Sequence, residues 1–222
     1  VGACVFPAGM AMVLVAGSEL FTGNNLIILA VLEKKVPVWK MLKNWLVVYI
    51  GNFLGTAFVA CVVVYAHTPD LFQGALATAI VNAGKARTDL SIPEAFFRGI
   101  LCNILVCIAI WMSFAAKRVS GKLMTSFWPV MLFVLCGFEH CVADMYFGVA
   151  ALLTSAEYGI AAEGLTWGNF LLKSLVPITL GNIVGGAGIV GVGYWLAYLH
   201  RTPYAHETTE QEQEEIDIAE EY

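Results

Sequence analysis

The sequence predicts an all-α integral membrane protein whose two broken membrane helices are related by an inverted repeat. First, 59% of the 222 residues are hydrophobic and only 13% are charged, whereas a soluble domain has roughly 25% charged residues. Second, the apolar segments are long and nearly free of internal charge, which is typical of membrane helices rather than alternating barrel strands. Third, two of these segments carry matching polar interruptions.

Five apolar segments are expected. They are residues 3–32 (interrupted at 19–25), 41–65, 95–115, 126–153 (interrupted at 139–144) and 169–199. The second, third and fifth are long enough to cross a bilayer as single helices, which takes about 20 residues. The halves of the first and fourth are too short to cross alone, so each interrupted segment is expected to be one broken helix.

The two interruptions match residue by residue. Residues 17–24 read GSELFTGN and residues 137–144 read GFEHCVAD, so glycine and glutamate occupy the same offsets and each octet ends in Asn or Asp. Broken apolar segments in corresponding halves of a chain indicate a transport site near the membrane midplane.

Lysine and arginine set the expected orientation. One side of the membrane holds the basic residues that follow the first, third and fifth segments: Lys34, Lys35, Lys40, Lys43, Lys117, Arg118, Lys122 and Arg201. The positive-inside rule makes this side cytoplasmic. The opposite side holds loops 68–93 and 155–168, and the C-terminus is expected in the cytoplasm.

A second repeat follows each interrupted segment. The pattern Gly-Asn-x-x-Gly occurs at residues 51–55 and again at 181–185. This spacing lets helix backbones approach closely, so a packing role is favoured. The second half then has three membrane helices and the first has two, and the broken helices cross in opposite directions. We therefore expect the first spanning helix of a six-helix protein to be missing from this chain, upstream of Val1.

The interruptions supply the candidate site residues. The second half of each broken helix begins with an N-terminus aimed at the midplane, where its partial positive charge and free N–H groups favour an anion. Thr22, Asn24 and Asn25 add neutral hydrogen-bonding groups to the first interruption. His140 is expected to be functional rather than a buried structural histidine, because ionisable residues inside membrane spans usually mark pathways.

Three charged residues have competing interpretations. Glu19 and Glu139 are expected to stabilise the loops by accepting hydrogen bonds from freed backbone N–H groups, in preference to relaying protons. Lys85 lies in the outer loop, where the sequence alone favours a solvated charge over a cation that concentrates anions at a pore mouth. A few bulky residues near the interruptions are candidates for apolar constrictions: Phe6, Met10, Phe21 and Phe133.

Other functions have little support in the sequence. It has no phosphate-binding Gly-x-x-x-x-Gly-Lys-Ser/Thr loop and no His-Glu-x-x-His motif, and its scattered histidines indicate no metal site or cofactor. No enzymatic activity and no nucleic-acid partner are expected. Residues 1–200 are assigned to a membrane channel domain. Residues 201–222, with eight acidic side chains between Glu207 and Glu221, are assigned to an acidic, disordered cytoplasmic tail.

The motifs together resemble the formate/nitrite transporter family. The resemblance rests on residues 17–25 (GSELFTGNN), 43–46 (KNWL) with the following Gly51-Asn52, 99–107 (GILCNILVC), 137–140 (GFEH) and 177–186 (PITLGNIVGG). It covers almost the whole chain to Leu199 and excludes the acidic tail.

The resemblance implies an aquaporin-like protomer of six helices that forms a homopentamer, with one pore per protomer, in the cytoplasmic membrane of a prokaryote. It implies passage of small monovalent anions, here formate first, with nitrite or hydrosulfide close behind. The pore threonine of the family falls on Thr22, the central histidine on His140 and the vestibule lysine on Lys85. The apolar rings would involve Phe6, Met10, Phe21 and Phe133.

These expectations give a mechanistic hypothesis. Lys85 and the helix dipoles attract the anion, which is protonated near the apolar ring and crosses as a weak acid. His140 either donates a hydrogen bond or supplies the proton. Two alternatives are a neutral small-solute channel of the same fold and a membrane scaffold that recruits a partner through its acidic tail.

Overall fold

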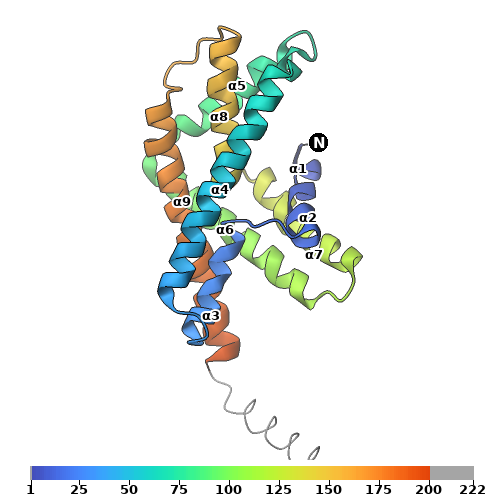
Figure 1. The fold of residues 1–222 in the computed structure, drawn as a ribbon, viewed down its shortest axis with the longest axis vertical. Helices are drawn as coiled ribbons and strands as arrows, with labels where there is room; N and C mark the ends of the chain where they lie inside the picture. Colours follow the sequence, from blue (N-terminus) through green and yellow to red (C-terminus); the bar gives the residue numbers. More distant parts are fainter. Residues whose placement is uncertain (1, 201–222) are drawn as a thin grey trace, which may run out of the picture.

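The computed structural model describes residues 2–200. Val1 and residues 201–222, including the predicted acidic tail, lie outside the described residues. From Gly2 to His200 the chain forms helices, turns and bends without a β-strand (Figure 1). This confirms the predicted all-α class.

The helices are, in chain order, α1 (Gly2–Val5), α2 (Pro7–Ala16), η1 (Gly23–Ile27), α3 (Ile28–Leu32), α4 (Val38–Tyr65), η2 (Thr68–Asp70), α5 (Ala75–Thr88), α6 (Ile92–Ala115), α7 (Val119–Leu135), α8 (Cys141–Glu157), η3 (Asn169–Leu175), α9 (Val176–Ile183), η4 (Val184–Gly191), α10 (Val192–Tyr194) and η5 (Trp195–Leu199). The last five form one continuous helix, Asn169–Leu199, whose turns alternate between α and the wider π type.

Three helices are long and apolar enough to cross a membrane. They are α4, α6 and the continuous Asn169–Leu199 helix, and they correspond to the second, third and fifth predicted segments. α6 begins with a capping box, in which Ser91 accepts from the N–H of Glu94 and the Glu94 carboxylate accepts from the N–H of Ser91. These paired bonds satisfy two backbone donors that the first helical turn leaves free.

The two remaining segments are broken, as predicted, and each break begins at a left-handed glycine. α2 ends at Gly17 (φ 77°), and Gly137 (φ 67°) follows the end of α7. Glycine adopts this conformation at the least cost and commonly ends a helix. We call residues 17–22 break 1 and residues 136–140 break 2.

The predicted limits of the interruptions were wrong by a few residues. They were placed at 19–25 and 139–144, but helical structure resumes at Gly23 in the first half and at Cys141 in the second. The polar character of Asn24, Asn25 and Asp144 suggested a loop, whereas all three residues lie in the first turn or two of a helix. Their side chains bond residues outside their own helical turns, and sequence periodicity does not reveal such contacts.

Residues 68–93 are not simply a loop. They contain η2 and the 14-residue helix α5, which packs on α8. The buried residues of α5 are Ala77, Val81, Gly84 and Thr88, whose spacing of four, three and four follows one face of a helix. Small side chains on this face, with Gly84 against Ala151 of α8, let the two helices pack closely.

The second Gly-Asn-x-x-Gly pattern packs as expected. Gly181 and Gly185 lie against the backbone of α6 at Phe96 and Ile100, and a Cβ added at Gly99 would lie 2.6 Å from the carbonyl oxygen of Ile178. The equivalent Gly51 and Gly55 of α4 have nothing within 4 Å of an added Cβ. The two copies of the pattern therefore differ in their packing among the described residues.

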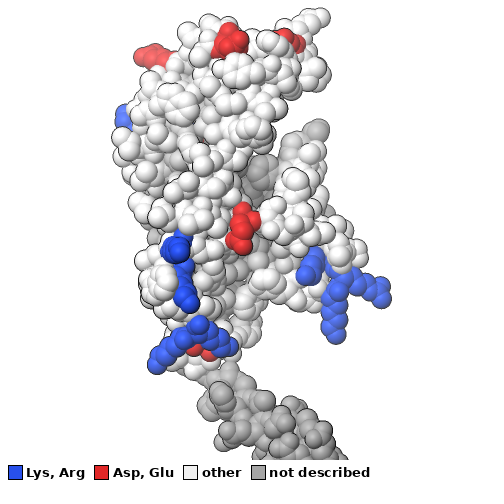
Figure 2. Space-filling model, in the orientation of Figure 1, with Lys and Arg blue, Asp and Glu red and all other residues white. Residues whose placement is uncertain are grey.

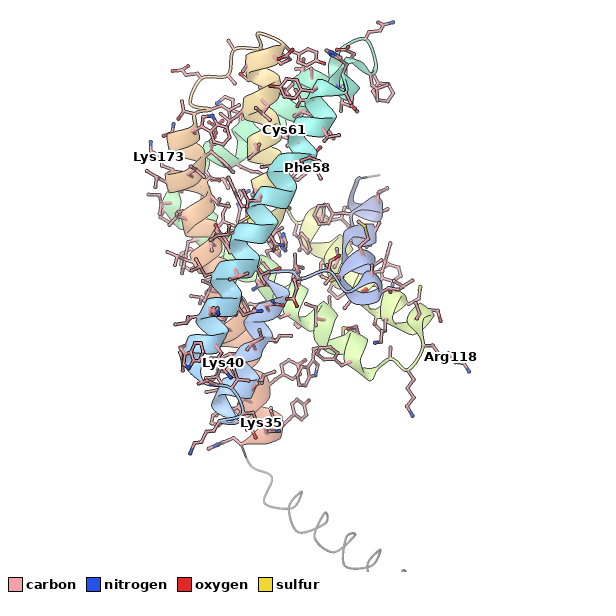
Figure 3. The ribbon with its side chains drawn as sticks, in the orientation of Figure 1. Lys35, Lys40, Phe58, Cys61, Arg118 and Lys173 are labelled. Carbon is pink, nitrogen blue, oxygen red and sulfur yellow. The ribbon has the colours of Figure 1, made fainter. Side chains whose placement is uncertain are left out.

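The basic residues gather toward one end of the molecule. Figure 2 shows lysine and arginine side chains on the lower part of the visible face, near the point where the described chain ends. Lys35, Lys40 and Arg118 are labelled there in Figure 3, and Lys173 lies in the opposite, upper part. That this end faces the cytoplasm stays a prediction of the positive-inside rule.

The α6–α9 contact can be tested with two glycines of the same long helix. We expect Gly185→Ala to lower the free energy of unfolding by about 1–3 kcal/mol, because its methyl group would enter the α6 backbone. The midpoint of thermal unfolding of the purified protein measures the effect. Gly188→Ala is the control, since a Cβ at Gly188 meets open space. Equal midpoints for the two variants would contradict the close contact.

Candidate functional site

An asparagine side chain holds each break at the same offset. At break 1, Asn52 of α4 accepts from the N–H of Phe21 (3.0 Å) and donates to the C=O of Glu19 (3.0 Å). At break 2, Asn182 of α9 accepts from the N–H of Cys141 (2.9 Å) and donates to the C=O of Glu139 (3.1 Å). We call these side chains the amide clamps.

The amide clamps define equivalent positions in the two halves. Each clamp bonds the residue before and the residue after one central residue, which is Leu20 in break 1 and His140 in break 2. A primary amide is suited to this because it donates and accepts at once. The inverted repeat therefore appears in the hydrogen bonds as well as in the sequence. Leu20 and His140 occupy equivalent positions in the two halves.

His140 occupies the junction between break 2 and α8. Its Nδ1 caps the helix by accepting from the N–H of Ala143 (3.1 Å), and its Nε2 lies 2.8 Å from the Thr22 hydroxyl of the other break. Because Nδ1 accepts, the neutral ring carries its proton on Nε2 and donates to Thr22. The Thr22 hydroxyl then keeps its own proton for another acceptor.

A buried chain of asparagines connects the two breaks behind this pair. Asn103 of α6 donates to Asn25 Oδ1 (2.9 Å) and to the C=O of Asn182 (2.6 Å), and Asn25 donates to the C=O of Phe21 (3.1 Å). Asn25, Asn103 and Asn182 are fully buried. Together with the Thr22–His140 hydrogen bond, this chain fixes the breaks relative to one another.

The largest cavity at the breaks is mostly apolar. It has a volume of about 510 Å³ and is lined by Phe6, Gly9, Met10, Met12, Val13, Leu20, Thr56, Val106, Val130, Phe133, His140, Val142, Ala143, Tyr146 and Phe147. We call it the central cavity. A mostly apolar lining with a histidine and the hydroxyl-bearing Thr56 and Tyr146 can admit a small solute and offer it hydrogen bonds at a few places.

Two further cavities adjoin the central cavity through different residues, and we name them inner and outer after the predicted orientation. The inner cavity, about 460 Å³, includes Ser18, Glu19 and Asn24 and shares Val13 and Leu20 with the central cavity. The outer cavity, about 110 Å³, includes Arg87, Glu139 and Asp144. It shares five residues with the central cavity: Phe6, Phe133, His140, Ala143 and Phe147. These shared residues separate a row of three compartments.

Aromatic contacts build the outer separation. The rings of Phe6 and Phe133 meet edge to face at 5.6 Å, and Phe133 stacks on the His140 ring at 5.8 Å. His140 therefore stands at an apolar constriction, with its ring orientation fixed by one aromatic contact and two hydrogen bonds.

The cation at the outer cavity is Arg87 and not the predicted Lys85. Lys85 makes an exposed ion pair with Asp89 of its own helix (2.7 Å) and is absent from the outer cavity lining. Arg87 donates from Nε to Asp144 (2.5 Å) and packs over the Phe147 ring at 4.1 Å. α5 turns these two residues toward different surroundings because they are two positions apart on a helix.

The predicted constriction residues separate into two groups. Phe6, Met10 and Phe133 line the central cavity. Phe21 lines none of the three cavities and is buried against Trp45 and Tyr49 of α4. Leu20, its neighbour, takes the position at the cavity. Successive residues of an extended break point to opposite sides, so the phase of the break decides which one faces the path.

The predicted polar residues have distinct positions. Thr22 bonds His140, and Asn24 faces the inner cavity, where its amide donates to Glu19 (2.5 Å) and Asn44 (2.9 Å). Asn25 points away from the cavities into the buried asparagine chain. It supports the path without lining it.

The expected role of the two glutamates differs from their observed partners. Glu19 accepts from the Asn24 side chain, and Glu139 lies 3.6 Å from Arg87 and 4.0 Å from Arg98. The freed backbone groups are bonded by Asn52 and Asn182 instead. A carboxylate only accepts, whereas each amide satisfies one N–H and one C=O together. Asn52 and Asn182 belong to the repeated Gly-Asn-x-x-Gly pattern, which was interpreted from the sequence only as a packing motif.

Two half-helices that meet at a row of cavities, with one histidine between apolar constrictions, define a membrane transport protein. A sequence model of the formate/nitrite transporter family matches residues 1–196. The chain therefore belongs to the formate/nitrite transporter family, whose members are channels and transporters rather than enzymes.

Relatives of known name support the assignment. The chain is 38% identical over 213 residues to formate channel FocA of Haemophilus influenzae, covering 91% of this chain and 74% of the relative. It is 39% identical over 209 residues to a probable formate transporter of Methanothermobacter thermautotrophicus, covering 88% and 73%.

Solved structures agree with the fold. A pentameric formate channel with formate bound superposes with a TM-score of 0.76 at 32% identity, over 89% of this chain and 82% of the other. An ion channel of the same family superposes with a TM-score of 0.78 at 28% identity, over 88% and 75%.

The Thr22–His140 hydrogen bond can be tested by an isosteric change. We expect Thr22→Val to reduce substrate flux into proteoliposomes by about tenfold, the factor that corresponds to losing one hydrogen bond of about 1.5 kcal/mol. Thr22→Ser is the control, because it keeps the hydroxyl group. Full flux through Thr22→Val would show that the hydroxyl group has no part in transport.

Proposed function

We propose that this protein is a formate channel that also admits other small monovalent weak-acid anions, assembled as a homopentamer. The observation that carries the proposal is His140, which lines both the central and the outer cavity at an apolar constriction and is bonded to the fully buried Thr22. The names of the relatives and of the pentameric solved structure support formate and the oligomeric state. We propose that the basic end, with the C-terminus, faces the cytoplasm of a prokaryotic cell.

The apolar constrictions favour passage of the protonated acid. An anion between Phe6 and Phe133 would lose hydration without gaining a charged partner, which costs several kcal/mol. Formic acid is neutral, and its C=O group can accept a hydrogen bond from His140, which lines both cavities. Nitrous acid and hydrogen sulfide are also small and neutral, so nitrite and hydrosulfide are further candidate substrates.

His140 acts in this proposal as a fixed hydrogen-bond donor and not as the source of the proton. Protonating the ring at Nδ1 would put two N–H groups face to face at Ala143 and remove the α8 cap. The N-terminus of α8 also disfavours a positive charge there. Of the two roles that the sequence left open, the geometry favours the hydrogen bond.

A flux measurement tests the substrate and the role of His140. In proteoliposomes, we expect formate uptake to rise when the outer solution is acidified, because the fraction of formic acid rises. His140→Asn should reduce the rate at every pH and keep the pH dependence, since the amide supplies a hydrogen bond without a titratable group.

Two outcomes would contradict this proposal. A pH-independent uptake in wild-type protein would exclude the weak-acid route. A flux that loses its pH dependence only in His140→Asn would make His140 the proton donor. Nitrite and hydrosulfide, measured in the same vesicles, rank the alternative substrates.

Leu20 is the expected inner barrier. Leu20→Ala removes the larger of the two side chains that the inner and central cavities share, so we expect the rate of lactate relative to formate to rise at least about tenfold. Leu54→Ala is the control, because Leu54 is exposed on α4 and lines none of these cavities. An unchanged ratio in Leu20→Ala would remove Leu20 from the path.

A further inference from the structure

The outer cavity contains an unusual grouping of buried charge. Two carboxyl groups, Asp144 and Glu139, line it with Arg87 and His140. Their side chains are 1% and 10% exposed. Arg87 Nε lies 2.5 Å from Asp144 Oδ1 and 3.6 Å from Glu139 Oε2, so one guanidinium group serves both carboxyl groups.

The other charged groups around this cluster contribute little to it. Arg98 of α6 approaches Glu139 only to 4.0 Å, has a side chain that is 42% exposed and does not line the cavity. The longer distance and the exposed guanidinium group make this interaction weaker than those of Arg87. Lys85 of α5 is paired with Asp89, and both ring nitrogens of His140 are bonded to groups outside the cluster, at Thr22 and Ala143. The buried part therefore has two acidic groups and one cation.

One oxygen of the cluster has no donor. Among the described residues, Asp144 Oδ2 is buried without a hydrogen-bond partner, and Glu139 lines the same cavity and approaches the same guanidinium group. Two ionised carboxylates cannot bond to one another, because neither has a proton to donate. Buried polar atoms in proteins are rarely left unpaired.

We propose that Asp144 and Glu139 share one bound proton and form the proton-binding site of the outer cavity. The proton satisfies the orphaned Asp144 oxygen, and with Arg87 it makes the buried cluster electrically neutral. The inference rests on the proposed weak-acid route and identifies the group that supplies its proton. A carboxyl pair that shares one proton is an established way to avoid placing two like charges side by side.

The proton transfer balances without another reactant. A formate anion in the outer cavity accepts the proton, so the O–H bond of the Asp144–Glu139 pair breaks and an O–H bond forms on formate. The pair is left with one more negative charge and takes a new proton from the outer solution. Neutral formic acid then passes His140 and ionises on the inner side. One proton accompanies each formate.

Infrared spectroscopy of the full-length protein tests the site without transport. At neutral pH, we expect wild-type protein to show a protonated-carboxyl C=O band that shifts in D₂O. Asp144→Asn should lack this band. Asp89→Asn is the control, because it removes an exposed carboxylate of similar position on the outer side and leaves the cluster intact. If Asp144→Asn fails to assemble, Glu139→Gln replaces it and should abolish the shared-proton band.

Formate-coupled proton uptake in proteoliposomes is measured in parallel. We expect Asp144→Asn to reduce it by about a hundredfold, the typical contribution of a positioned acid group, and Asp89→Asn to leave it unchanged. Absence of the band in wild-type protein, or its survival in Asp144→Asn, would overturn the proposal. If wild-type protein shows the band but does not transport formate, the proton site stands and the proposed function is wrong.

Discussion

The structure depends on how two broken membrane helices satisfy the backbone groups that the breaks set free. Lipid offers no hydrogen bonds, so an unpaired N–H or C=O at this depth must be bonded by protein or by water. Asn52 and Asn182 do this with one amide each. Because each amide bonds both sides of one residue, it also fixes the direction of Leu20 or His140.

The same hydrogen-bonding arrangement gives the two halves different chemistry. The clamped residue of break 1 is an apolar leucine at the boundary of the inner cavity. Its counterpart in break 2 is a histidine at the outer constriction, held by Thr22 and by the α8 N-terminus. The inverted repeat places an amide clamp at each break. The clamped residue differs: Leu20 forms an apolar barrier, whereas His140 can form hydrogen bonds.

The sequence predicted the spans, the two breaks and their repeat, because composition and residue offsets record these features directly. It did not predict which residues face the path. Phe21 and Leu20 are neighbours, as are Lys85 and Arg87 within one helical turn, and their directions depend on backbone phase and on α5 packing against α8. The asparagines of the Gly-Asn repeats were interpreted only as part of a packing motif, since a hydrogen bond across the fold leaves no local pattern.

Hydrogen exchange at break 2 tests the central claim most directly. The amide N–H of Cys141 is bonded to Asn182 Oδ1, so replacing Asn182 with the similarly sized leucine removes its acceptor. The account predicts faster exchange at Cys141 in Asn182→Leu, with the exchange of α4 unchanged. Equal protection of Cys141 in wild-type and variant protein would contradict the claim that the clamp holds the break.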